Sequence, residues 1–218
     1  MIRLRAKKEF LPLLKTEPRF IEAIQLCRIL SAIQYNKVIY ALLSERGDFD
    51  TNLQLNLVIN HAAVLYEGIK KFNTLAERLK NMESYKKNIE KIEKLADREN
   101  SFINEVLHNI RRKVAFHFDK QVITRELAEF IDDCIHEDED MIFVAGSTDQ
   151  VKDMRFLLAD SLNLRFIVGL VKGEQLSYVE KFKILTTTLI GLSGSFCDIL
   201  EEIIPEMVAD YCELVDQE

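Results

Sequence analysis

The residues with the clearest chemical potential lie in one short segment near the middle of the chain. A cationic cluster of Arg111, Arg112 and Lys113 is followed by an apolar step and then by His117 and Asp119. An imidazole that titrates near neutral pH can take or give a proton. A guanidinium can hold a phosphate through two parallel hydrogen bonds. Together, these groups have the chemistry needed to cleave RNA without a metal ion.

The same segment also suits an ordinary helix end. Cationic side chains are favoured near the C-terminus of a helix, where the helix dipole is negative, and His117 could cap a backbone carbonyl there. Short motifs often match by chance. The segment taken alone therefore favours this structural interpretation over a catalytic one.

The segment resembles the Arg-x(4–6)-His motif of HEPN domains (higher eukaryotes and prokaryotes nucleotide-binding), with Arg112 and His117 as the matching residues. The resemblance implies an all-α bundle with the motif between two helices. It also implies a homodimer that cleaves RNA without a metal, as toxins and phage-defence proteins of the family do. Many active members have a polar residue, commonly Asn, directly after the Arg, where this chain has Lys113. That departure favours the alternative of a non-catalytic helical module that dimerises or binds a partner.

The resemblance assigns roles to individual residues. Arg112 and His117 are the expected catalytic pair. RNA phosphate binding is expected of three further cations: Arg111, Lys113 and Lys120. Supporting roles at the same site are expected of Glu105, His108 and Asp119.

A helical wheel predicts where this site lies. At about 100° per residue, Glu105, His108 and Arg112 fall on the face opposite the apolar seam of their helix. We therefore expect the site, and the contact between two copies of the chain, on this outward face. Arg112 and His117 would diverge by roughly 140° on a continuous helix. They can converge only if that helix ends near Lys113.

Apolar residues at spacings of three and four predict a mainly all-α fold, an antiparallel bundle of long helices. Pro18 and Glu45 bound the first expected helix, and the second ends near Leu79, so that the two form an antiparallel hairpin. Further helices are expected over residues 89–110, from Thr124 to Cys134, over 161–171 and over about 175–204. Pro205 is expected to kink or divide the last of these.

We expect one helical domain over residues 1–218, with three parts. Residues 17–138 are expected to form the HEPN-like bundle, and residues 161–213 the C-terminal helices. Between them, two apolar runs flank Gly146 to Asp149, which predicts a small β-hairpin inserted at 141–158.

A metal site is the third interpretation. Glu105 and His108 have the Glu-x-x-His spacing of half a di-iron site, and Asp133 and His136 nearly repeat it. A ferritin-like protein also needs a glutamate from each of two other helices, all projecting inward. The wheel turns Glu105 and His108 outward, so we expect no metal and no other cofactor.

Composition limits the classes of function and the cellular locations that remain. The net charge of −7 argues against a protein coated with basic surface for DNA, although a local basic site stays compatible with it. The four cysteines stand singly, which suits a reducing cytosol and predicts a cytoplasmic protein. Neither a signal peptide nor a membrane span is expected. The expected partners are a second copy of the chain, RNA and a further protein.

Overall fold

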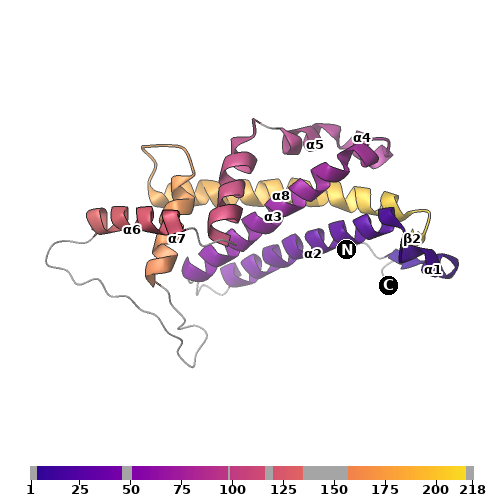
Figure 1. Ribbon diagram of the computed structural model, residues 1–218, viewed down its shortest axis with the longest axis horizontal. Helices are drawn as coiled ribbons and strands as arrows, with labels where there is room; N and C mark the ends of the chain where they lie inside the picture. Colours follow the sequence, from indigo (N-terminus) through magenta and orange to yellow (C-terminus); the bar gives the residue numbers. More distant parts are fainter. Residues whose placement is uncertain (1–3, 46–50, 98, 116–119, 135–156, 215–218) are drawn as a thin grey trace, which may run out of the picture. The chain divides into compact units, whose positions relative to one another are not determined.

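The structure, a computed structural model, describes residues 4–45, 51–97, 99–115, 120–134 and 157–214 (Figure 1). Helices dominate it, so the all-α prediction is confirmed. The elements in chain order are β1 (Leu4–Ala6), η1 (Lys8–Phe10), α1 (Leu11–Leu14), α2 (Pro18–Glu45), α3 (Thr51–Leu79), α4 (Glu83–Lys87), α5 (Ile89–Ala96), η2 (Phe102–Leu107), η3 (Ile110–Ala115), α6 (Lys120–Cys134), α7 (Leu157–Gly169), α8 (Tyr178–Val208) and β2 (Cys212–Leu214).

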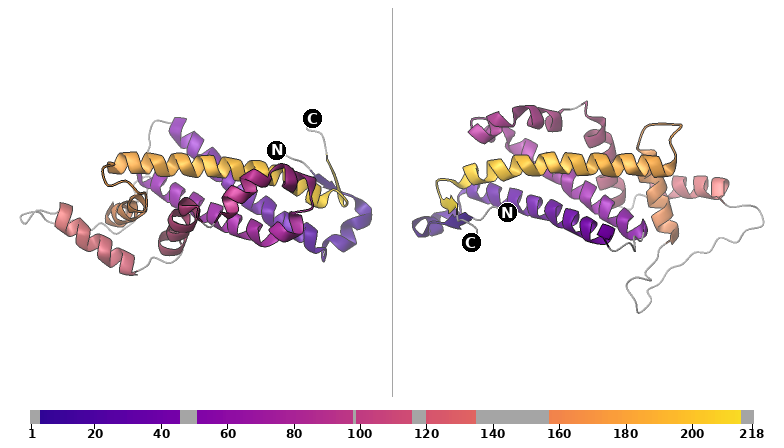
Figure 2. Two further views of the ribbon diagram at one scale, coloured as in Figure 1. Left: turned by 90° about the horizontal axis from the view of Figure 1, so that it is seen from above. Right: turned by 180° about the vertical axis from the view of Figure 1, so that it is seen from behind.

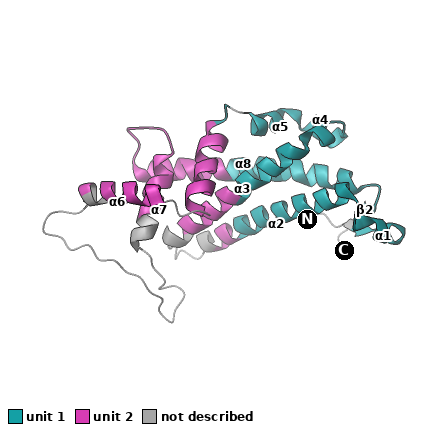
Figure 3. Cartoon of the chain, viewed as in Figure 1, with its two compact units in different colours: residues 1–38, 64–100, 190–218 teal, residues 39–63, 101–189 magenta. Residues whose placement is uncertain are grey.

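The chain folds into two compact units (Figure 3). Unit 1 comprises residues 1–38, 64–100 and 190–218, and unit 2 comprises residues 39–63 and 101–189. Both units are therefore built from segments that are far apart in the sequence.

In unit 1, parts of α2, α3 and α8 lie together as a bundle in which α2 runs opposite to α3 and α8 (Figure 2). The ring of Phe196 packs edge-on against Phe72, with centroids 5.9 Å apart. Gly68 allows α3 to approach closely, because a Cβ there would lie only 2.6 Å from Ile29 Cγ2. Further along, Arg78 of α3 pairs with a glutamate at the start of α2. These contacts give α2 and α3 opposite directions, as the sequence predicted.

Carboxylates of α8 hold the short helices α4 and α5 in unit 1. α4 has no cap from its own sequence. Glu206 supplies one from α8, accepting hydrogen bonds from the backbone N–H groups of Glu83 at 2.9 Å and Ser84 at 2.8 Å. One turn earlier, Glu202 accepts from Asn88 at 3.0 Å and pairs with Lys87 at 2.9 Å. Charge-assisted bonds of this kind satisfy backbone donors that a helix start leaves open.

A short two-stranded antiparallel sheet joins the two ends of the described chain within unit 1. β1 pairs with β2 in a register that sets Arg5 opposite Glu213. Beside it, the rings of Phe10 and Tyr211 meet edge-on with centroids 5.7 Å apart. No pattern in the sequence predicts this sheet, since each strand has only three residues.

The hairpin that the sequence did predict, at 141–158, lies outside the described residues except at its end. Leu157 and Leu158 there are helical and begin α7. The prediction of strand for these two residues is therefore wrong, because the apolar run to which they belong continues into a helix.

The predicted helix over residues 89–110 is also wrong as a single element. α5 ends at Ala96, and Asp97 has extended backbone angles. The Asp97 carboxylate accepts a hydrogen bond from the Glu99 backbone N–H at 2.9 Å. Short acidic side chains compete with the helix for backbone donors in this way. In contrast, α8 runs on to Val208, so Pro205 does not divide it.

α8 has the length and hydropathy, 1.2 on average over its most apolar stretch, that also occur in membrane-crossing helices. Core helices of other proteins share both properties, and in unit 1 α8 buries Phe196, Ile199 and Ile203 completely. Cys27, Cys197 and Cys212 are free thiols. The cytoplasmic location stays a prediction.

Candidate functional site

The helical run that carries most of the predicted site residues is largely π-helical. The backbone N–H of His108 donates to the carbonyl of Ile103, five residues earlier, and to that of Glu105. The Asn109 side chain also donates to the Glu105 carbonyl, at 2.7 Å. π-Helical turns are rare and occur often at functional sites. They also widen the helix, so faces derived from an α-helical wheel hold only approximately.

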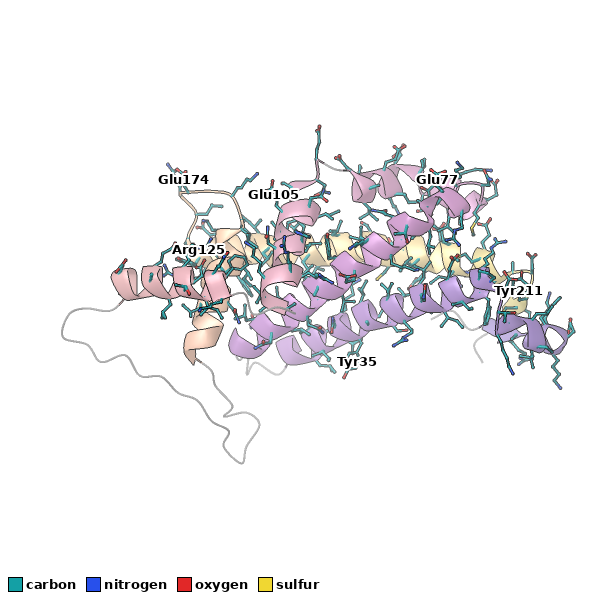
Figure 4. All side chains as sticks on the ribbon, in the orientation of Figure 1. Tyr35, Glu77, Glu105, Arg125, Glu174 and Tyr211 are labelled. Atoms are coloured by element: carbon teal, nitrogen blue, oxygen red, sulfur yellow. The ribbon has the colours of Figure 1, made fainter. Side chains whose placement is uncertain are left out.

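The outward placement of two predicted residues is nevertheless confirmed. Glu105 and Arg112 are exposed, while His108 is half-buried. Val106 of the same run is buried on the opposite side, as the apolar seam predicted. Glu105 pairs with Lys172 at 3.3 Å, so its carboxylate is already engaged within unit 2 (Figure 4).

The other predicted residues divide into two groups. Arg111 and Lys113 are half-buried, and Lys120 is exposed at the start of α6. His117 and Asp119 lie outside the described residues. The pairing of Arg112 with His117 therefore stays a prediction.

Unit 2 contains a pocket of about 480 Å³ beside this helical run. Lys113 is the one predicted site residue that lines it, together with the neighbouring Asn109. The pocket wall also includes Arg125 of α6, Arg165 of α7 and Tyr178 of α8. Three cations from three separate elements therefore surround one cavity.

Arg125 is held in place by its neighbours in the pocket wall. Its guanidinium lies 5.8 Å from the ring centroid of Phe166. It bonds to Glu126 at 2.5 and 3.1 Å and lies 3.9 Å from Glu129. Glu126 is only 5% exposed, and charge-assisted bonds offset the cost of burying its carboxylate. Arg125 is thus fixed and largely neutralised.

Another part of the wall combines a cation with an exposed ring. The guanidinium of Arg165 lies 5.9 Å from the ring centroid of Tyr178, which is 53% exposed. Tyr178 is the first residue of α8, and Ser177 before it forms a capping box with Glu180. The hydrogen bonds from Ser177 lower the pKa of Glu180. The capping box fixes the start of α8, and hence the position of the Tyr178 ring.

Lys113 forms no ion pair with any residue among those that the structure describes. Its ammonium is therefore a cation that the pocket offers to an anion. Phosphate is an anion that such a cation, beside aromatic rings, is suited to hold.

The sequence did not point to Arg125, Arg165 or Tyr178. They lie well apart along the chain, on helices that no motif links. The Ser177-x-x-Glu180 spacing is visible in the sequence and marks the start of α8. It does not reveal which pocket the next residue would line.

A metal site receives no support from the described side chains. Within residues 4–134 and 157–214, gaps excepted, no three His, Cys, Asp or Glu side chains are grouped so as to hold an ion. His136 lies outside the described residues, as does the side chain of Asp133.

No family model, curated protein or solved structure matches the chain. The HEPN resemblance therefore stays a prediction that rests on Arg112 and His117.

Proposed function

We propose that this chain is a HEPN-like, metal-independent endoribonuclease that binds RNA through unit 2. The observation that carries the proposal is the exposed Arg112, adjacent in sequence to Lys113 in the wall of a cationic, aromatic pocket. Cations hold the phosphates of single-stranded RNA, and exposed rings stack on its bases. Both kinds of group are present in one wall.

In the proposed reaction, the 2′-oxygen of RNA attacks the adjacent phosphorus while the bond to the 5′-oxygen breaks. His117 takes the proton of the 2′-hydroxyl or gives a proton to the leaving 5′-oxygen. Arg112 binds the phosphate oxygens and offsets the negative charge that grows on them. The products are a 2′,3′-cyclic phosphate and a 5′-hydroxyl, and no metal takes part.

The test is cleavage of a labelled single-stranded RNA in the presence of EDTA. Losing a positioned proton-transfer group costs about a hundredfold to ten-thousandfold in rate. His117→Ala and Arg112→Ala should therefore abolish most cleavage, whereas Arg5→Ala, at an exposed arginine of unit 1, should not change it. Equal rates for His117→Ala and the unmodified chain would remove His117 from the chemistry.

The second candidate is an RNA-binding module without cleavage. The observation that favours it is Lys113, which stands where active HEPN members often have Asn and which lines the pocket. A chain of this kind binds RNA with Lys113 and Arg165 and leaves it intact. RNA binding with no cleavage of any RNA would support this candidate and contradict the first.

We also propose a homodimer, and α2 offers the surface for it. Four large apolar side chains of α2 in unit 1 are exposed by 41 to 66%: Ile21, Ile24, Tyr35 and Val38. With Arg28 and Ser31 between them, they follow the three-four spacing by which one helix packs against another. Figure 4 shows Tyr35 projecting away from the neighbouring helices.

A second copy is the partner that this strip fits. Its two ends are apolar and its middle is Arg28 and Ser31, so two antiparallel copies match apolar ends with apolar ends. The face of Glu105, His108 and Arg112, where the sequence predicted the contact, is polar by comparison and stays open to RNA.

Sedimentation tests this dimer. Ile24→Glu buries a charge in the proposed contact and should yield a monomer at tens of micromolar. Gln25→Glu adds the same charge to the same helix but off the strip, and should leave the dimer intact. A monomeric unmodified chain would defeat the proposal.

A further inference from the structure

We infer that the pocket in unit 2 is a nucleotide subsite, and that it selects a guanine nucleotide of the bound RNA. The inference deepens the proposed function, because the nucleotide is taken to belong to the RNA that the chain binds. It assigns a task to Tyr178, Arg165, Lys113 and Glu129, none of which the cleavage step requires.

The size of the pocket suits a single nucleotide. Its volume of about 480 Å³ falls in the range of roughly 300–1,000 Å³ that is typical of small-molecule sites. Its wall is contributed by Lys113, by α6, by α7 and by the first residue of α8. A ligand in it can therefore contact cations, rings and carboxylates at once.

The base has a stacking partner in Tyr178. This ring is exposed, and the capping box of Ser177 and Glu180 fixes the turn that carries it. The guanidinium of Arg165 lies over the same ring. Unstacked bases of RNA bind to tyrosine rings and to planar guanidinium groups in this manner.

The phosphate has a cation available in Lys113. Lys113 forms no ion pair with the other described residues, and Arg165 contributes a guanidinium to the same wall. Arg125, in contrast, is bonded to Glu126 and contributes little charge. Lys113 is thus the group that holds the phosphate, and Arg165 stays with the ring of Tyr178.

The choice of base follows from Glu129. Its side chain is 54% exposed, and Arg125, the cation that pairs with it among the described residues, is 3.9 Å away, beyond hydrogen-bond distance. The carboxylate is therefore open to two donors. Guanine carries two adjacent donors on its Watson–Crick edge, N1–H and the N2 amino group, whereas adenine, cytosine and uracil do not.

Gly169 offers a way to block the pocket without disturbing the fold. It lines the cavity at the end of α7, and a Cβ added there would meet no atom within 4 Å. Gly169→Leu therefore adds a large side chain to the pocket wall. Gly191 in α8 is a matched control, since a Cβ there also meets nothing within 4 Å and Gly191 does not line the pocket.

The experiment is calorimetric titration of the full chain with GMP, AMP, CMP and UMP. GMP should bind about tenfold more tightly than the others, the size of effect that paired hydrogen bonds to a charged group produce. Gly169→Leu should weaken GMP binding by at least about tenfold, and Gly191→Leu should leave it unchanged. Glu129→Gln should bring GMP to the level of AMP.

Three results would overturn the inference. Equal GMP affinity for Gly169→Leu and the unmodified chain would show that GMP does not bind in the pocket. Equal affinity for the four nucleotides would contradict the selection of guanine. No binding at millimolar GMP would contradict both the pocket and the selection. Thermal melting of each variant verifies that it is folded.

The titration separates this inference from the proposed function, because free GMP binds without being cleaved. GMP binding together with no RNA cleavage contradicts the nuclease alone. Metal-independent RNA cleavage that Gly169→Leu leaves unchanged contradicts the subsite alone.

Discussion

In unit 1 the carboxylates of α8 are matched to donors on and beside α4, whereas in unit 2 Lys113 lines an open pocket. Glu206 accepts hydrogen bonds from backbone N–H groups at the start of α4, and Glu202 accepts one from the side chain of Asn88. Lys113 forms no ion pair with the other described residues and lines a cavity of about 480 Å³ instead. Charges with matched partners hold a structure together, and charges beside open space are available to a ligand. The comparison predicts that substitutions in unit 1 change stability and that substitutions around the pocket change binding.

The largest change in stability is expected at Gly68, and Gly169 is its control because the two glycines differ in packing. Gly68→Ala would place its Cβ 2.6 Å from Ile29 and 2.9 Å from Phe196, so the core must shift. Overpacking of this kind costs typically about 1–3 kcal/mol. Gly169→Ala meets no atom and should not destabilise the chain. Urea denaturation of both variants measures the difference, and equal stability would contradict the packing of α2, α3 and α8.

A smaller loss of stability is expected when the cap of α4 is removed. Glu206→Ala leaves the backbone N–H groups of Glu83 and Ser84 without their acceptor. Loss of a helix cap costs about 1 kcal/mol. Glu174→Ala, at an exposed residue of unit 2, is the control and should melt as the unmodified chain does. RNA affinity should be the same in both variants. A loss of RNA affinity confined to Glu206→Ala would contradict the assignment of stability to unit 1 and binding to unit 2.

The same contacts predict a dependence on pH. Burial pushes the pKa of Glu206 up, but hydrogen bonds from Ser84 and Glu83 outweigh burial and leave the pKa below its ordinary value of 4.5. Hydrogen bonds from Lys87 and Asn88 lower the pKa of Glu202 in the same way. A carboxyl with a lowered pKa stabilises the fold above its ordinary pKa, and this contribution is lost as the pH falls below it.

Melting temperatures between pH 6 and pH 3 test this dependence. Stability should fall as the pH drops through 4.5 and the lowered values. Glu206→Gln cannot titrate, so its decline should be shallower than that of the unmodified chain. Parallel declines for both would show that Glu206 has no part in the acid sensitivity.

The smallest effect is expected from Arg111, a half-buried cation next to the predicted catalytic arginine. Arg111→Ala should weaken RNA binding slightly and reduce the slope of log affinity against log salt by about one, as loss of a single phosphate contact does. Binding measured at several salt concentrations gives this slope. An unchanged slope would remove Arg111 from the phosphate contacts.

The sequence predicted the helices well, because apolar spacing of three and four reports a buried face directly. It predicted the exposure of Glu105 and Arg112 for the same reason. The prediction of a single helix over residues 89–110 failed at Asp97, where a side chain competes with the helix for a backbone donor over a single turn. The strands β1 and β2 were not predicted because they are too short to show a pattern.

The pocket was out of reach of the sequence for a different reason. Lys113 was predicted to bind phosphate, and it lines the pocket. Arg125, Arg165 and Tyr178 are brought to it by the packing of α6, α7 and the start of α8, and spacing along a chain carries no information on such packing. His117 and Asp119 lie outside the described residues, so their part in the site stays a prediction.

The most direct test of the account compares two lysines that differ in their surroundings. Lys113 lines the pocket without an ion pair among the described residues, and Lys87 pairs with Glu202 at 2.9 Å in unit 1. The affinity of Lys113→Ala and Lys87→Ala for one single-stranded RNA should be measured at fixed salt. Lys113→Ala should bind several-fold more weakly than the unmodified chain, and Lys87→Ala should bind equally well. Equal affinities for the two variants would contradict the assignment of RNA binding to unit 2.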